Sequence, residues 1–215
     1  MYTVTEIKTL YTFDELSDTA KDTAANNHIE CSPWVLDDIV QEYISWNMHA
    51  LRGVIVKNGK YENRLNYEYD MGCCQGSGFN FYGEFYLTDI FDLIGEDVPD
   101  DKREDAEGET VIFKSNSGHN GYTFSGWDNS LGYRDELEAR IAEVFPDVLP
   151  AAAQDFAREF CDKMHEHCRA VYDDLWEYIT EGVYIELDDE IHDGELYDAQ
   201  GNFCGFIEDL KATEA

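Results

Sequence analysis

The chain has 215 residues and carries 47 acidic against 15 basic side chains, a formal net charge of −32 at pH 7. Aromatic residues make up 14 %, which is too rich for a disordered acidic chain, so we expect a folded protein. There is no apolar run of membrane-spanning length, no secretory signal pattern and no cluster of Lys and Arg. We therefore expect no membrane span and no direct grip on nucleic acid or on an anionic membrane.

The N-terminal region predicts one strand and two helices. Partial alternation of apolar residues favours a strand over 2–13, and Ser17 then provides the N-cap of a helix that extends to about Asn27. Ser32 and Pro33 repeat this start signal for a second helix. The expected inner face of the second helix consists of Val35, Ile39, Tyr43 and Trp46.

The middle of the chain is typical of antiparallel strands. The pair Asn58–Gly59 predicts a hairpin turn between residues 54–56 and 65–69. An aromatic-rich stretch with period two predicts a strand over 79–86, and a short helix is expected over 88–94. A further pair of strands is expected at 110–114 and 122–127.

The last third is mainly helical. Amphipathic helices are predicted over 133–145 and, as the longest element, over 151–179, followed by two short strands around 198–202. Strands and helices mix without a regular β–α–β rhythm, which predicts an α+β fold with helices packed on one antiparallel sheet. We expect a single acidic domain over 1–215, with a possible subdivision near 146–150.

The acidic residues are concentrated in the middle and last parts of the chain. Residues 71–150 hold 17 acidic and 5 basic side chains, and residues 151–215 hold 18 and 4. The densest stretches are 96–105, expected to be an exposed loop, and 186–195. Adaptation to high salt or simple solubility would also explain such charge. We choose these acids as candidates for contact with a partner: Asp97, Asp100, Asp101, Glu104, Asp105, Glu186, Asp188, Asp189, Glu190, Asp193 and Glu195.

Cysteine and histidine residues were weighed as metal ligands. All six cysteines are interpreted as reduced thiols, because no secretory signal is present. Cys161, His165 and Cys168 share one face of the longest predicted helix, and thiolate and imidazole groups are good zinc ligands. The chain has no CxxC pair, however, and a cysteine beside an apolar stripe packs as a small hydrophobic residue. We favour packing over zinc.

Three other kinds of site were considered and set aside. An EF-hand beginning at Asp189 would need an acid at Ile191. The glycine-rich stretch 75–78 is not followed by the residues of a phosphate loop. A thiol nucleophile at Cys73 or Cys74 with His119 as base would suffer from the acidic surroundings, which disfavour a thiolate. No catalytic residue, metal or cofactor is therefore predicted.

Several segments resemble a family of phage and prophage proteins that are labelled antitoxins of a toxin–antitoxin stability system. They are residues 13–21, the aromatic strand preceded by 75–78, and the stretches 177–180 and 197–201. The family shows QGDG where this chain has Ser77 in place of the acid. The resemblance implies a mobile genetic element in a bacterial cytosol, and it brings no catalytic residues.

The charge favours one function over its alternatives. Duplex DNA carries one negative charge per about 1.7 Å, so 32 charges correspond to about 54 Å of duplex. The leading hypothesis is an anti-defence protein, anti-CRISPR or anti-restriction, that mimics DNA and blocks the groove of a basic nucleic-acid-binding complex. Exposed aromatics would add contacts. The alternatives are an antitoxin that neutralises a basic nuclease toxin, and an uncharacterised enzyme.

Overall fold

The structure is a computed structural model of the whole chain. It describes residues 8–48, 54–57, 60–63, 65–71, 78–94, 100–114, 127, 132–148, 150–189, 192 and 194–208. The chain forms two compact units. Unit 1 combines Met1–Ile39 with Leu175–Ala215, and unit 2 is Val40–Asp174. The expected subdivision point near 146–150 lies inside unit 2.

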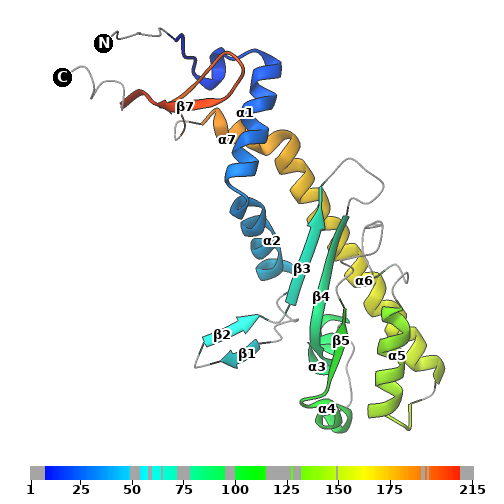
Figure 1. Cartoon of the computed structure of the whole chain (residues 1–215). Coiled ribbons are helices and arrows are strands. Elements are labelled where there is room, and N and C mark those ends of the chain that lie inside the picture. The colour runs from blue at the N-terminus through cyan, green and yellow to red at the C-terminus, as the bar shows by residue number, and fades with distance from the viewer. Residues whose placement is uncertain are drawn as a thin grey trace, which may run out of the picture. The chain divides into compact units, whose positions relative to one another are not determined.

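Helices and antiparallel strands occur together without a regular β–α–β rhythm, which confirms the predicted α+β class (Figure 1). Those within unit 1 are η1 (Phe13–Glu15), α1 (Asp18–Cys31), a π-helical turn (Tyr178–Gly182), α7 (Val183–Leu187), β6 (Glu195–Tyr197) and β7 (Phe203–Phe206). Those within unit 2 are β1 (Val54–Lys57), β2 (Lys60–Asn63), β3 (Leu65–Asp70), β4 (Gly78–Tyr86), α3 (Leu87–Ile94), α4 (Asp100–Ala106), β5 (Thr110–Phe113) and α5 (Tyr133–Val144). Helices α2 (Trp34–Asn47) and α6 (Pro150–Glu177) have residues in both units.

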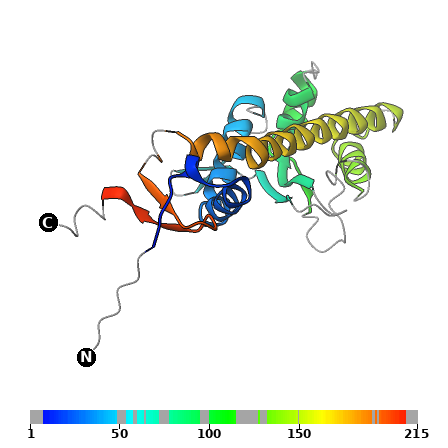
Figure 2. The same cartoon turned by 90° about the horizontal axis from the view of Figure 1, so that it is seen from above.

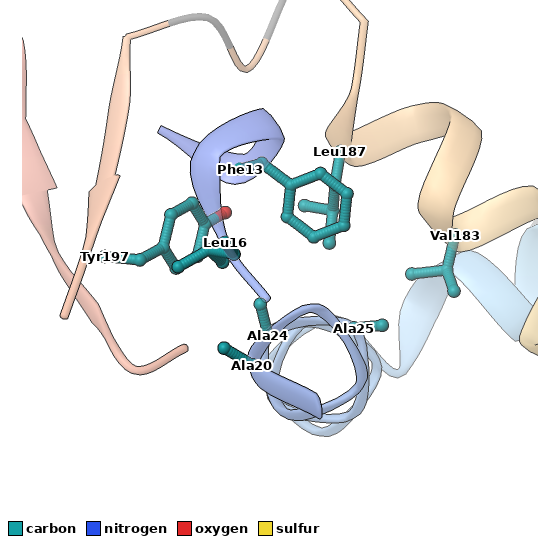
Figure 3. Close-up of a cluster of buried hydrophobic side chains, with 8 residues drawn as sticks. All are labelled: Phe13, Leu16, Ala20, Ala24, Ala25, Val183, Leu187 and Tyr197. Atoms are coloured by element: carbon teal, nitrogen blue, oxygen red, sulfur yellow. The ribbon is translucent and has the colours of Figure 1, made fainter. Parts of the chain in front are cut away.

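Unit 1 has a small hydrophobic core of its own. Figure 3 shows α1 presenting three alanines toward side chains from η1, α7 and β6. Small residues on α1 let these elements approach closely, and the larger side chains fill the space between them. The core consists of Phe13, Leu16, Ala20, Ala24, Ala25, Val183, Leu187 and Tyr197.

The turn between β6 and β7 packs directly on α1. Asp198 holds this turn, because its Oδ1 accepts the backbone N–H groups of Gln200, at 2.9 Å, and of Asn202, at 3.0 Å. Gly201 follows with φ +86°, and a β-carbon there would overlap the carbonyl oxygen of Ala20. Only glycine fits this position, because it tolerates a left-handed backbone and has no β-carbon to collide with the neighbouring main chain.

Unit 2 is built on the antiparallel sheet β3–β4–β5, with β4 in the centre. Alternation along β4 places Phe79, Phe81 and Phe85 in the core, each at most 3 % exposed. Phe85 contacts Phe160 of α6 edge to face, with ring centroids 6.2 Å apart. The sheet therefore buries this aromatic face against α6, as the period-two pattern predicted.

Buried polar groups of this core find partners. The indole N–H of Trp127 donates to the Phe81 carbonyl at 3.0 Å. The Tyr133 hydroxyl donates to the carbonyl of Lys114 and accepts from the Asn80 side chain. Asn80 is fully buried on β4, so this hydrogen bond satisfies a group that would otherwise be costly in an aromatic core.

Helix α6 is the longest element, and α5 lies beside its first half in both views (Figures 1 and 2). The Gln154 amide donates to the Glu138 carboxylate at 3.0 Å and so joins the two helices. Helix α6, the π turn and α7 follow one another without interruption as 38 helical residues. The buried stripe of α6 within unit 2 consists of Ala153, Ala157, Phe160, Cys161, Met164, Cys168 and Val171.

The structure corrects two of the predicted elements and leaves a third largely outside the described residues. Residues 8–10 form no strand, only Tyr11 makes a single bridge to Tyr197, and 1–7 lie outside the described residues. The hairpin around 58–59 pairs β1 with β2, while β3 pairs with β4 instead, because the central aromatic strand offers β3 a buried partner. The predicted strand at 122–127 is outside the described residues except for Trp127.

Helix α2 also differs from the prediction. It buries Leu36, Val40 and Ile44, one position further along than the expected face, and Trp46 is 74 % exposed. Apolar residues occur almost all round this helix, so two faces fit the helical period about equally well, and the packing partner decides between them.

Candidate functional site

A row of carboxylates follows the surface of α6 opposite its buried stripe. Each member is two residues beyond a buried residue of the stripe, a rotation of about 200° around the helix, so the two rows lie on opposite sides. All five acids are exposed. They are Asp155, Glu159, Asp162, Glu166 and Asp173, and we call them the acidic face of α6.

The spacing of this row is regular. Successive positions are three or four residues apart, and the one position held by a base is Arg169. The 18 residues between Asp155 and Asp173 span about 27 Å of helix axis. One acid thus occurs per about 7 Å on average, against one phosphate per about 3.4 Å along a single DNA strand.

Neighbouring bases modulate the charge of the acidic face. Lys163 is turned away, since its Nζ donates to the carbonyl oxygens of Leu93, at 3.0 Å, and Ile94, at 3.1 Å. Arg158 pairs with Asp155 at 2.7 Å, and Arg134 lies 3.8 Å from Asp162. Both carboxylates stay largely open to solvent, with 68 % and 64 % of their side chains exposed. Exposed pairs of this kind are weak, so a stronger binding partner can replace them.

The first predicted acidic stretch is placed on α4. Asp100 and Asp101 belong to this helix, which replaces the exposed loop expected here, and Asp97 lies outside the described residues. Ala106 is fully buried and Arg103 binds Asp92 of α3 at 2.7 Å, two contacts that hold the segment as a helix. Among the acids of α4 whose side chains the structure describes, Glu104 and Asp105 are exposed.

The second predicted stretch does not form one exposed surface. Asp188 and Asp189 are exposed, whereas Glu186 is half-buried and the Glu195 side chain is only 16 % exposed. Glu190 and Asp193 lie outside the described residues. The two glutamates instead join a cluster of histidine and tyrosine side chains within unit 1.

This cluster links α1, α7 and β6. Nδ1 of His192 lies 2.9 Å from Oε1 of Glu195, and Nε2 of His28 lies 3.4 Å from Oε1 of Glu186. The two imidazole rings meet edge to face, with centroids 5.6 Å apart. Each carboxylate therefore has a histidine beside it, although 158 residues separate His28 from Glu186 in the chain.

Two tyrosines complete the cluster. The hydroxyl of Tyr178 donates to Oε2 of Glu186, and that of Tyr197 donates to Oε2 of Glu195, both at 2.5 Å. Burial and the adjacent carboxylates raise the pKa of both phenols well above the usual value, so both remain protonated donors. The two tyrosines thus each donate a hydrogen bond to a carboxylate of the cluster, and His28, Glu195 and Tyr197 also line a pocket.

The cysteines of α6 are placed as the packing interpretation predicted. Cys161 and Cys168 are buried in the apolar stripe, and desolvation by burial raises the pKa of the Cys161 thiol to about 12. Within the described part of the chain, no group of three His, Cys, Asp or Glu side chains is arranged to hold a metal ion. Cys73, Cys74 and His119 lie outside that part.

Comparisons of the chain with protein-family models, with curated proteins and with solved structures gave no match. Among the residues that the structure describes, no helix has both the length and the apolar character needed to cross a bilayer. The acidic face of α6 is not among the predicted contact residues, although the sequence carries a signal for it: acids recur at helical spacing opposite the predicted apolar stripe.

Proposed function

We propose that this protein is an anti-defence inhibitor of a phage or another mobile element, acting as an acidic mimic of DNA in the bacterial cytoplasm. The observation that carries the proposal is the acidic face of α6. Its partner would be a basic nucleic-acid-binding assembly, either a CRISPR effector complex or a restriction enzyme. The overall charge of −32 supports the same conclusion.

The mimicry rests on rigidity as well as charge. Because the opposite side of α6 is fixed by Phe160 and Met164, both fully buried, the carboxylates occupy set positions along the helix. A groove lined by Lys and Arg attracts such a row from a distance, which speeds association. Bound there, the carboxylates take the place of phosphates and exclude DNA.

Competition with DNA tests this mechanism directly. A fluorescently labelled duplex is bound to a purified CRISPR effector or restriction enzyme, the protein is added, and anisotropy reports displacement. We expect displacement that weakens steeply between about 50 and 200 mM salt, since ion pairs with the groove carry the affinity. Parallel assays with a basic nuclease toxin separate this proposal from an antitoxin.

Matched variants locate the contact. Glu159→Lys with Glu166→Lys reverses two charges of the acidic face, and Glu30→Lys with Glu42→Lys makes the same change at exposed helical positions elsewhere. The first pair should weaken displacement at least tenfold and the second by much less. Equal losses would show that total charge alone acts, and displacement insensitive to salt would refute mimicry.

A further inference from the structure

Unit 1 contains a pocket of about 240 Å³ between α1 and the strands β6 and β7. Its walls come from distant parts of the sequence, because four of the described lining residues, His28 among them, belong to α1, while the other five belong to β6, β7 and the turn between them. Tyr197 also belongs to the core in Figure 3, so the floor of the pocket is continuous with the folded interior. The side chains that matter here are His28, Glu195, Tyr197, Phe203 and Phe206.

Three aromatic rings line one side of this pocket. Tyr197 and Phe203 meet edge to face at 6.1 Å between centroids, and Phe203 and Phe206 do so at 5.2 Å. Phe203 and Phe206 remain 50 % and 46 % exposed, which is unusual for side chains of this size. Because the rings are inclined to one another, a small molecule in the pocket could contact both ring faces and ring edges.

A carboxylate stands beside these rings. Glu195 is mostly covered, and its two oxygens are engaged by Tyr197 and His192, as described above. A carboxylate has about four acceptor positions, so it retains the capacity to bind a further donor. Among the described residues that line the pocket, none is a lysine or an arginine. The bases beside Glu195 in the described part of the chain are histidines, His28 in the lining and His192 at 2.9 Å, so a carboxylate without a lysine or arginine partner meets the guest.

We propose that this pocket binds an organic cation, an ammonium or guanidinium head on a short apolar stem. Glu195 receives the head by a charge-assisted hydrogen bond, and Tyr197, Phe203 and Phe206 surround it with ring faces that attract cations. An anion would be repelled by Glu195, and a neutral apolar guest would leave the remaining acceptor positions of that carboxylate unfilled. The volume limits the guest to a head group with a few carbons.

The head group is tested with n-butylammonium chloride and, as its neutral counterpart, n-butanol. Two-dimensional amide NMR of the full-length protein follows both titrations at constant ionic strength. We expect butylammonium to give saturable shifts at Gly201, Phe203 and Phe206, while butanol at equal concentration gives shifts at least fivefold smaller. Equal responses to both compounds would overturn the proposal.

Variants assign the roles of the charge and of the rings. Glu195→Gln should weaken butylammonium binding about tenfold, and Glu208→Gln, at an exposed site two residues beyond β7, should leave it unchanged. Because Glu195→Gln also disturbs Tyr197 and His192, Phe206→Leu provides a second variant on a half-exposed ring, and it should weaken binding severalfold. Binding that is indifferent to both variants would place the cation elsewhere.

The source of the cation is distinguished by a second pair of probes. A blocked tripeptide Gly-Lys-Gly is compared with its norleucine counterpart in the same NMR titration. Tighter binding of the lysine peptide than of butylammonium would identify the guest as a basic side chain of a protein. Weaker binding of that peptide would identify a free amine, and the absence of saturable shifts with every cation would reject the pocket as a cation site.

Discussion

The α-carbon of Gly201 packs against the backbone carbonyl of Ala20 and so fixes the β6–β7 turn to the first helix. This contact joins residues 181 positions apart without any side chain between them. It also sets one wall of the pocket, since Gly201 lines it.

Replacing Gly201 by Ala should therefore be strongly destabilising. The new methyl group must displace main chain, and the left-handed conformation adds strain, so we expect a loss of about 2 kcal/mol or more. Gly108→Ala is the control, because Gly108 has a similar φ of +81° and open space around its β-carbon position. It should cost about 1 kcal/mol. Amide hydrogen exchange at Ala24 and Ala25 measures the local effect, and equal protection in both variants would contradict this packing.

Asp89 of α3 should make the protein more stable in mild acid. Desolvation by burial, and secondarily Asp92, raises the pKa of Asp89 to about 6, and its Oδ2 is buried without a hydrogen bond from the described residues. In the unfolded chain the pKa is about 3.9, so the folded state disfavours the charge above pH 6 and this cost disappears as pH falls toward 4.

The variant Asp89→Asn isolates this effect. We expect it to raise the free energy of unfolding by about 1 kcal/mol at pH 7.5 after allowance for solvent screening, and to leave it unchanged near pH 4. Asp105→Asn, at an exposed position on α4, serves as the control and should change little at either pH. Urea unfolding at several pH values gives both comparisons, and a gain that persists at pH 4 would point to a cause other than ionisation.

His167 should act in the opposite direction. Burial lowers its pKa below 6.5, and the Tyr43 hydroxyl lies 2.9 Å from Nδ1. The unfolded chain then takes up a proton more readily, so this residue's contribution to stability is complete above pH 6.5 and is lost as pH falls through that value toward the lower folded pKa. NMR titration of the imidazole carbons should give His167 a midpoint below 6.5. A midpoint at or above 6.5 would be inconsistent with its burial.

The cysteines should separate by reactivity in the folded protein. Cys31 and Cys204 are exposed, whereas Cys161 and Cys168 are buried and the raised pKa of Cys161 keeps its thiol protonated. Brief treatment with iodoacetamide at pH 8, followed by peptide mass spectrometry, should therefore label the first two and spare the others. Denatured protein provides the control, in which all four should react. Rapid labelling of Cys161 in the native state would show that the α6 stripe opens easily.

The sequence predicted those elements whose local pattern agrees with their final packing. The alternation along β4 and the apolar stripe of α6 each have one buried face, so local residues suffice to identify it. The predicted buried face of α2 is wrong, because apolar residues occur on two faces of this helix and the sequence does not distinguish them. The pocket was not predictable, since it depends on His28 meeting residues near 195–206 through contacts of long sequence separation.

The π turn at Tyr178–Gly182 changes the direction in which the residues after it point, because a π-helix has more residues per turn than an α-helix. Leu175 and Val183, both fully buried, are eight residues apart, and in an uninterrupted α-helix they would differ by about 80° in direction. The wider turn absorbs part of this rotation and brings Val183 and Leu187 to face α1. Deleting Thr180 would turn everything after it by about 100° and expose both side chains. The length of this turn thus sets the rotational phase between Leu175 and Val183.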